Sequence, residues 1–225
     1  MLQKSLIYIT LWLLLQLLVE INCQTTPFKP EARAYHTATY IDNKLYILGG
    51  INLANSDTND FFYLDVSVPF NTQNLPWEDL SDLSNINNTV PAAHESATSV
   101  KGGANNNTLF LYGGTFNVTV ASVYIFNPQS NSWSIPNMTG TRPNPGVIDT
   151  TGVIDNNGKM YIWSGAEVTN GTNFESNMFI LDTIKLSWGN GSLNGAPDAS
   201  ALYGATLLSD DKIIYIGEQV ILRFS

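Results

Sequence analysis

Short runs of alternating hydrophobic and polar residues fill the chain after residue 24, and no segment there repeats its hydrophobic residues with a helical period. The runs are rich in β-branched and aromatic residues, as in residues 44–48 (KLYIL) and 61–65 (FFYLD), and clusters of Asn, Gly, Ser and Asp separate them. Strands favour this composition and alternation, whereas the intervening residues favour tight turns. The pattern therefore predicts an all-β protein.

The runs also return in a fixed order. In the first copy an aliphatic run ends in Gly49 and Gly50, an aromatic run contains Tyr63, and Trp77 follows. The equivalent positions of the later copies are Gly113, Gly114, Tyr124 and Trp133, then Gly165, Phe179 and Trp188, and finally Gly217. A repeat of about 50 residues indicates an array, and about four strands per repeat is typical of a propeller blade. In such a blade the glycines let the backbone bend, and each tryptophan is expected to fill the wedge between blades.

This ordered set of glycines, aromatic strand residues and tryptophan resembles the kelch repeats, over residues 33–217. The resemblance implies a kelch-type β-propeller with about three complete four-stranded blades and part of a fourth, which is an incomplete ring. Two departures, Ser164 for the first glycine of the third copy and Glu218 for the second of the fourth, are expected to reduce the bend there. We expect one propeller segment over residues 24–225, with blades at residues 31–80, 90–136 and 145–190 and a partial blade at 199–225.

Residues 1–23 are typical of a signal peptide. Lys4 precedes an apolar run over residues 6–19, which is too short for a transmembrane helix of about 20 residues. We therefore predict a secreted or extracellular protein with no stable membrane span; an uncleaved signal that anchors the chain is the alternative. Cys23 is the sole cysteine and lies beside the expected cleavage point, so the mature chain would contain no disulfide.

The charge of the chain limits its partners. Lys and Arg number 10 against 19 Asp and Glu, which gives a net charge of −9. Nucleic acids and anionic lipids are held by cationic surfaces, so neither is expected as a partner.

Catalysis is not expected either. The resemblance extends to galactose oxidase, whose propeller has kelch-like blades and whose copper-radical site implies a tyrosine cross-linked to cysteine, a second tyrosine and two histidines. No cysteine lies in residues 24–225. The repeat places His36 and His94 at equivalent positions in consecutive copies, followed by Asp149, but a shared ion would need donors about 2 Å away and a third or fourth ligand. We therefore predict no catalytic residue, no metal and no cofactor.

Six Asn-x-Ser/Thr sequons would allow N-glycosylation of an exported chain. Asn, Ser and Thr are frequent enough that chance explains most of them, but all six fall in expected loops or turns, where a glycan can be carried. The candidate sites are Asn87, Asn106, Asn117, Asn137, Asn170 and Asn190.

The expected loops differ between the two faces of the propeller. Long polar loops on one face are expected at residues 51–60, 81–93, 115–122 and 166–176, and the other face has mainly short turns, except at residues 66–76. Long loops on a rigid scaffold are how repeat proteins recognise partners. We therefore expect a non-catalytic interaction scaffold for a protein or glycan ligand.

Two alternatives remain open. One is a truncated relative of a secreted galactose-oxidase-like carbohydrate oxidase whose active site lies outside this chain, and the other is a gene remnant with no function of its own. An incomplete ring also leaves two blade faces in water, so self-association or further sequence is expected to cover them.

Overall fold

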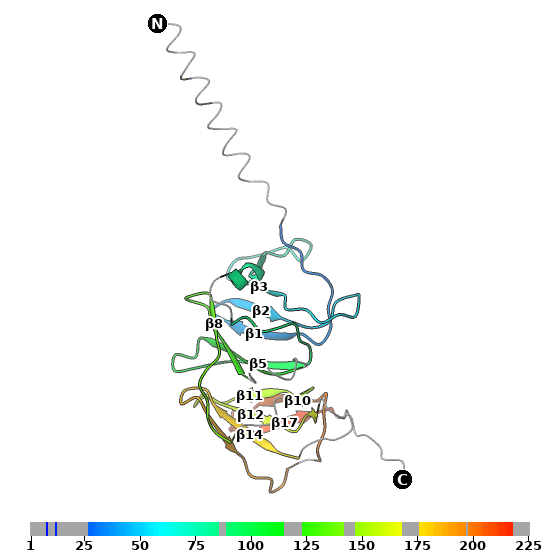
Figure 1. Ribbon diagram of the computed structural model, residues 1–225, viewed down its shortest axis with the longest axis vertical. Coiled ribbons are helices and arrows are strands. Elements are labelled where there is room, and N and C mark those ends of the chain that lie inside the picture. The colour runs from blue at the N-terminus through cyan, green and yellow to red at the C-terminus, as the bar shows by residue number, and fades with distance from the viewer. Residues whose placement is uncertain are drawn as a thin grey trace.

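The computed structural model describes residues 27–85, 89–114, 123–141, 147–167, 176–196 and 198–217, together with Tyr8 and Trp12. Its strands form small sheets that follow one another in chain order, from β1–β3 at one end of the body to β14 and β17 at the other (Figure 1). In the large sheets, strands adjacent in sequence are antiparallel neighbours, as in propeller blades. Within the described ranges no helix is long and apolar enough to cross a membrane.

The first two blades have the expected four strands each. The first contains β1 (Thr37–Ile41), β2 (Lys44–Leu48), β3 (Phe61–Asp65) and β4 (Trp77–Asp79). The second contains β5 (Ala97–Gly102), β6 (Thr108–Gly113), β7 (Val123–Asn127) and β8 (Ser132–Ser134). Asp42 and Asn43 join β1 to β2 with φ values of 47° and 62°, the left-handed pair that a tight type I′ hairpin requires. The 3₁₀ helix η1 (Ser81–Asn85) follows β4.

The third blade has an additional strand and the fourth is a hairpin. The third contains β11 (Gly152–Ile154), β12 (Lys159–Trp163), β14 (Met178–Asp182) and β15 (Ser187–Asn190), with β9 (Thr139–Gly140) added in parallel to β15. The described part of the fourth contains β16 (Gly204–Leu207) and β17 (Ile213–Ile216), and a separate pair contains β10 (Val147–Ile148) and β13 (Ala166–Glu167). The predicted all-β propeller class is therefore confirmed.

Alternation along the strands gives each blade two apolar faces, because successive side chains point to opposite sides of a sheet. Phe61 of β3 packs toward the second blade, where its ring lies 4.7 Å from that of Phe126 and 5.1 Å from that of Trp133. The buried residues of this first interface are Ile41, Tyr46, Leu48 and Phe61 with Leu109, Leu111, Tyr124, Phe126 and Trp133. Trp133 thus packs on the blade that precedes its own.

The interface between the second and third blades repeats this arrangement. The ring of Trp188 lies 5.1 Å from that of Tyr112 in the second blade. The buried residues are Val100, Phe110, Tyr112 and Val123 with Met160, Ile162, Phe179, Leu181 and Trp188. At both interfaces, the third strand of a blade and the tryptophan of the same blade pack against the preceding blade.

The two ends of the arc differ from each other. On the outer face of the first blade, Phe62 is only 2% exposed. Trp77, Phe28 and Arg33 cover its ring, at 5.4, 5.5 and 4.8 Å respectively. The expectation that both end faces lie in water is therefore wrong around Phe62, because the segment before β1 folds back over it.

Candidate binding face at the channel mouth

A belt of backbone hydrogen bonds joins the innermost strands of successive blades at the edge where these strands begin. Tyr35, Ser96, Asp149 and Leu202 each stand just before an inner strand, with φ values between 55° and 58°. The amide of Ser96 donates to the carbonyl of Tyr35 (2.9 Å), that of Asp149 to Ser96 (3.1 Å), and that of Leu202 to Asp149 (3.0 Å). The same left-handed position thus recurs in every copy and fixes the mouth of the central channel.

This belt corrects the predicted alignment of the histidines. Asp149 is equivalent to Tyr35 and Ser96, whereas His36 comes one residue after the belt and His94 two residues before it. The position equivalent to His94 in the first copy is Arg33. The prediction failed because it matched residue types, whereas the equivalence is set by backbone conformation. Among the described residues, no group of three or more His, Cys, Asp or Glu side chains is placed to hold a metal.

His94 links the first two blades. Its side chain is 1% exposed, and its Nδ1 lies 2.7 Å from the carbonyl oxygen of Ala92. Its amide donates to the carbonyl of Thr58 (3.1 Å) and its carbonyl accepts from the amide of Gly50 (2.8 Å). Burial lowers the pKa of the imidazole. A Cβ added at Gly49 would stand 2.7 Å from His94 Nε2, so the glycine makes room for the histidine.

Arg33 occupies the equivalent position with different chemistry. Its guanidinium donates to the carbonyl of Gly49 (3.1 Å), the hydroxyl of Thr58 (3.2 Å) and the carboxylate of Asp60 (2.7 Å). The side chain is 5% exposed. No pattern in the sequence distinguishes Arg33, because its equivalence to His94 follows only from the backbone conformation of Tyr35 and Ser96.

Ser164 also departs from expectation. Its φ is 54°, close to the 67° and 73° of Gly49 and Gly113, so the serine does not reduce the bend. Its hydroxyl accepts a hydrogen bond from the amide of Ser200 at 3.0 Å. This bond in a buried site helps to stabilise a conformation that serine rarely adopts.

The loop at residues 51–60 rises from the belt edge and carries an exposed leucine. The side-chain oxygen of Asn52 accepts hydrogen bonds from the amides of Ala54 (3.0 Å) and Ser56 (3.1 Å). These bonds order the loop tip, where Leu53 is 84% exposed. Of the other expected long loops, residues 115–122 and 168–175 lie outside the described ranges, as do residues 86–88.

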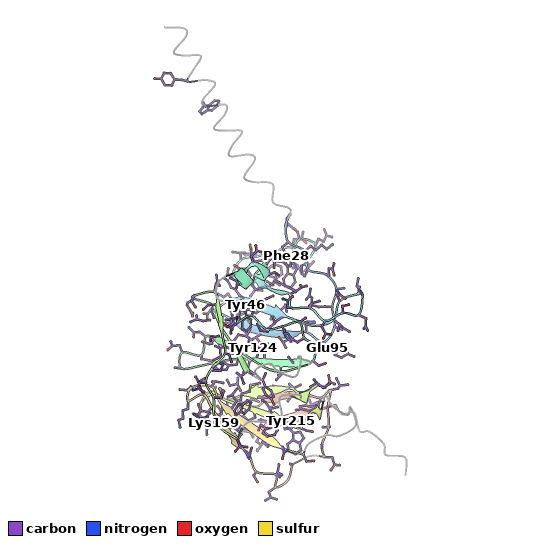
Figure 2. All side chains as sticks on the ribbon, viewed as in Figure 1. Phe28, Tyr46, Glu95, Tyr124, Lys159 and Tyr215 are labelled. Atoms are coloured by element: carbon purple, nitrogen blue, oxygen red, sulfur yellow. The ribbon has the colours of Figure 1, made fainter. Side chains whose placement is uncertain are left out.

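Carboxylates and apolar side chains share this edge. Thr58 pairs with His94, and the amide of Asp149 donates to the carbonyl of Ser96, so the backbone brings Asp57, Glu95 and Asp149 to the same edge. Burial, and then the charges of Asp57 and Asp149, raise the pKa of Glu95, which Figure 2 labels beside the second blade. We define the mouth surface as Tyr35, Leu53, Leu202, Asp57, Glu95 and Asp149. Its three apolar members are 52%, 84% and 50% exposed.

An open groove lies behind the mouth. Residues of the inner strands β1, β5, β11 and β16 line it, and its volume is about 350 Å³. The hydroxyls of Thr39 and Ser99 lie 2.5 Å apart there and link the first two blades. Lys101 and Thr206 also line this space.

Three of the six sequons lie in the described part of the chain. Asn106 and Asn137 are exposed in irregular segments. Asn190 is exposed too, but it ends β15 and pairs with Phe179, so the prediction that it lies in a loop is wrong. Asn87, Asn117 and Asn170 lie outside the described residues.

Comparison with known proteins identifies the fold family. Residues 18–221 match the model of the Attractin/LZTR1 β-propeller. The chain belongs to this β-propeller family. Similar proteins include the Rab9 effector protein with kelch motifs of Xenopus laevis, 23% identical over 75% of this chain and 44% of that protein. The predicted kelch resemblance is thereby confirmed.

Two further proteins and one solved structure are also similar to this chain. Host cell factor 2 of Homo sapiens is 27% identical over 65% of this chain and 19% of its own length. The Rho GTPase-activating protein gacHH of Dictyostelium discoideum is 25% identical over 74% of this chain and 11% of its own. The chain thus spans less than half the length of these relatives. The structure of YjhT has a TM-score of 0.59 at 18% identity, over 81% of this chain and 58% of that one.

Proposed function

We propose that this kelch-type propeller is a secreted, non-catalytic scaffold that binds a protein through the mouth surface. The observation that carries the proposal is the exposure of Tyr35, Leu53 and Leu202 on the edge fixed by the hydrogen-bonded belt. Exposed apolar side chains rimmed by charged ones are typical of protein-binding surfaces. A relative named as an effector protein with kelch motifs also supports protein binding.

The charge of the mouth surface specifies the partner further. Asp57, Glu95 and Asp149 bring three carboxylates together in a chain of net charge −9. Such a surface favours a partner that presents lysine or arginine beside apolar side chains. Binding should then weaken as salt is raised, because salt screens exposed charges beyond about 10 Å at 0.1 M.

The binding proposal is tested with two matched substitutions, each of which replaces an exposed aliphatic side chain by serine. Leu53→Ser removes an apolar side chain from the mouth surface, and Val68→Ser removes one that is 53% exposed on the opposite edge, between β3 and β4. Proteins captured by the immobilised chain from extracellular medium are identified, and their affinities for each variant are measured. We expect about a tenfold loss for Leu53→Ser alone, the effect of truncating a binding hot spot.

The opposite outcome would place the site elsewhere. Loss of binding with Val68→Ser and not with Leu53→Ser would move the interface to the other face. A glycan array probed with the same two variants tests the carbohydrate ligand; glycan binding that depends on Leu53, without protein capture, would replace the protein by a glycan.

Secretion and glycosylation belong to the same proposal. Their support is the short apolar run at residues 6–19 behind Lys4, together with the exposure of Asn106, Asn137 and Asn190. Expression in eukaryotic cells should yield a secreted protein that starts near residue 24 and gains mobility on deglycosylation. N-terminal sequencing of intracellular material that still starts at Met1 would contradict cleavage, and unchanged mobility would contradict glycosylation.

A further inference from the structure

A cavity separates the third blade from the hairpin β16–β17. Its volume is about 410 Å³, and Tyr161 and Met178 line it from the third blade, whereas Ile213 and Tyr215 line it from β17. Leu207 and the polar residues Asp155, Asn157 and Asp211 complete the lining. Figure 2 labels Tyr215 at this end of the body. The hydroxyl of Tyr215 is buried and makes no hydrogen bond with any described residue. A space of this size is large enough for two apolar side chains.

The corresponding space is filled at both earlier interfaces. Two alternate residues of the third strand occupy it: Tyr124 and Phe126 of β7 between the first two blades, and Phe179 and Leu181 of β14 between the next two. These four side chains are between 0% and 7% exposed. In the described part of the fourth blade no third strand pairs with β17.

The free side of β17 matches the pattern of earlier second strands. Ile213 and Tyr215 face the third blade, while Ile214 and Ile216 face away and are 40% and 66% exposed. Gly217 has a φ of 81°, as left-handed as the equivalent Gly49. Within the described part of the chain, the hairpin therefore has an unpaired edge along β17, and Ile213 and Tyr215 provide only part of the apolar contact with the third blade.

Residues 221–225, Ile-Leu-Arg-Phe-Ser, have the sequence of the strand that is needed. They lie outside the described residues. Aligned with 61–65 (FFYLD) and 178–182 (MFILD), they place Leu222 and Phe224 at the positions of Phe179 and Leu181. Four residues, 217–220, would connect them to β17, a common length for a loop between antiparallel strands.

We propose that residues 221–225 dock on the free edge of β17 as the third strand of the fourth blade, with Leu222 and Phe224 in the cavity. The register follows the earlier blades, where Ile47 pairs with Phe62 and Ile162 with Phe179. Leu222 then lies opposite Tyr215 and Phe224 opposite Ile213.

Arg223 falls opposite Ile214 on the outer face. The equivalent residues Tyr63, Ile125 and Ile180 are all only partly buried, so a charged group is tolerated at this position. The aliphatic part of the arginine side chain covers Ile214 while the guanidinium stays in water. The opposite alternation would place Arg223 in the cavity and leave both Leu222 and Phe224 outside.

A disulfide experiment tests the register in the full chain with Cys23→Ser. In the first blade the Gly49 amide donates to the Asp60 carbonyl (3.0 Å), so by alternation Tyr46 and Tyr63 form a non-hydrogen-bonded pair, with Cα atoms about 4.5 Å apart. Ile214→Cys with Arg223→Cys reproduces this pair at a distance that a disulfide spans. Ile214→Cys with Leu222→Cys is the control and reports a register shifted by one residue.

The expected result is an intramolecular disulfide in the 214/223 pair and none in the 214/222 pair, shown by peptide mapping without reduction. A bond in the shifted pair overturns the register, and a bond between two chains shows that a second copy occupies the edge. Absence of any bond also overturns the proposal.

Thiol labelling gives an independent measurement with single cysteines. Phe224→Cys should react at least tenfold more slowly than Arg223→Cys with a soluble maleimide, because the first side chain points into the cavity and the second into water. Equal rates would show that residues 221–225 do not dock in this way, whatever the disulfide result.

Discussion

The two ends of the arc carry the same strand pattern in different surroundings. At the first blade, Phe62 is 2% exposed under the rings of Phe28 and Trp77. At the fourth, Ile214 and Ile216 are 40% and 66% exposed. The difference lies outside the strands themselves: a segment folds back over the first end, whereas no described residue covers the β17 edge.

This difference shows how a repeat protein handles its ends. Inner blades bury both faces against neighbours, so a terminal blade needs a substitute neighbour to keep its apolar residues out of water. Residues 27–33 act as this substitute neighbour, through the aromatic ring of Phe28 and the guanidinium of Arg33. An apolar side chain gains about 1.5–3 kcal/mol on full burial, so even a short capping segment contributes substantially to a domain of ordinary stability.

The largest expected effect comes from the core of the capped end. Phe62→Ala should lower the free energy of unfolding by about 3–5 kcal/mol, the cost of truncating a buried phenylalanine. Ile216→Ala, on the uncovered face, should change it by less than about 0.5 kcal/mol. Urea denaturation of both variants measures the difference. Equal losses would show that the two ends are buried alike in solution.

Sequence predicted the features that depend on local pattern. The period of two predicted the strands around Phe61 and Phe179, and the paired glycines marked the left-handed bend at Gly49. Two features were missed because their partners are distant in sequence. Phe28 meets Phe62 only after folding, and Thr139 joins the third blade by pairing with Ser187.

The candidate site was less predictable than the fold. The long loop at residues 51–60 was expected on the binding face, but Arg33 and His94 occupy one equivalent position with different side chains. Repeats preserve backbone conformation more closely than residue type, so a histidine-to-histidine alignment gave the wrong register. The belt through Tyr35 and Ser96 became recognisable only from its φ values and hydrogen bonds.

Substitution of Arg33 should have an intermediate effect on the free energy of unfolding. Arg33→Met keeps the length of the side chain but removes its bonds to Gly49, Thr58 and Asp60, and should cost about 2 kcal/mol. Lys185→Met is the control, since Lys185 is 79% exposed and 3.9 Å from Asp182; it should change stability very little. If both variants melt alike, Arg33 does not hold the capping segment in place.

The smallest expected effect is a pH dependence of the free energy of unfolding that comes from His94, the residue equivalent to Arg33 in the second copy. Burial is the main cause of the lowered pKa of His94, and the Ala92 carbonyl and the charge of Asp57 oppose it in part. In the unfolded chain a histidine titrates near pH 6.5, so as the pH falls the unfolded state takes up the proton first. The stabilisation from neutral His94 is therefore complete above about pH 6.5 and is lost as the pH falls below it.

Urea denaturation between about pH 7.5 and 5.5 measures this loss, since ordinary carboxylates titrate near pH 4. Glu95, whose pKa is raised, has the opposite sign: its protonation favours the folded state as the pH falls. His94→Gln should remove most of the decrease in stability over this range. His36→Gln should remove little of the decrease, because the side chain of His36 is exposed, although burial and the charge of Arg33 lower its pKa. If His94→Gln leaves the pH dependence of stability unchanged, or if His36→Gln abolishes it, then protonation of His94 does not destabilise the contact between the first two blades.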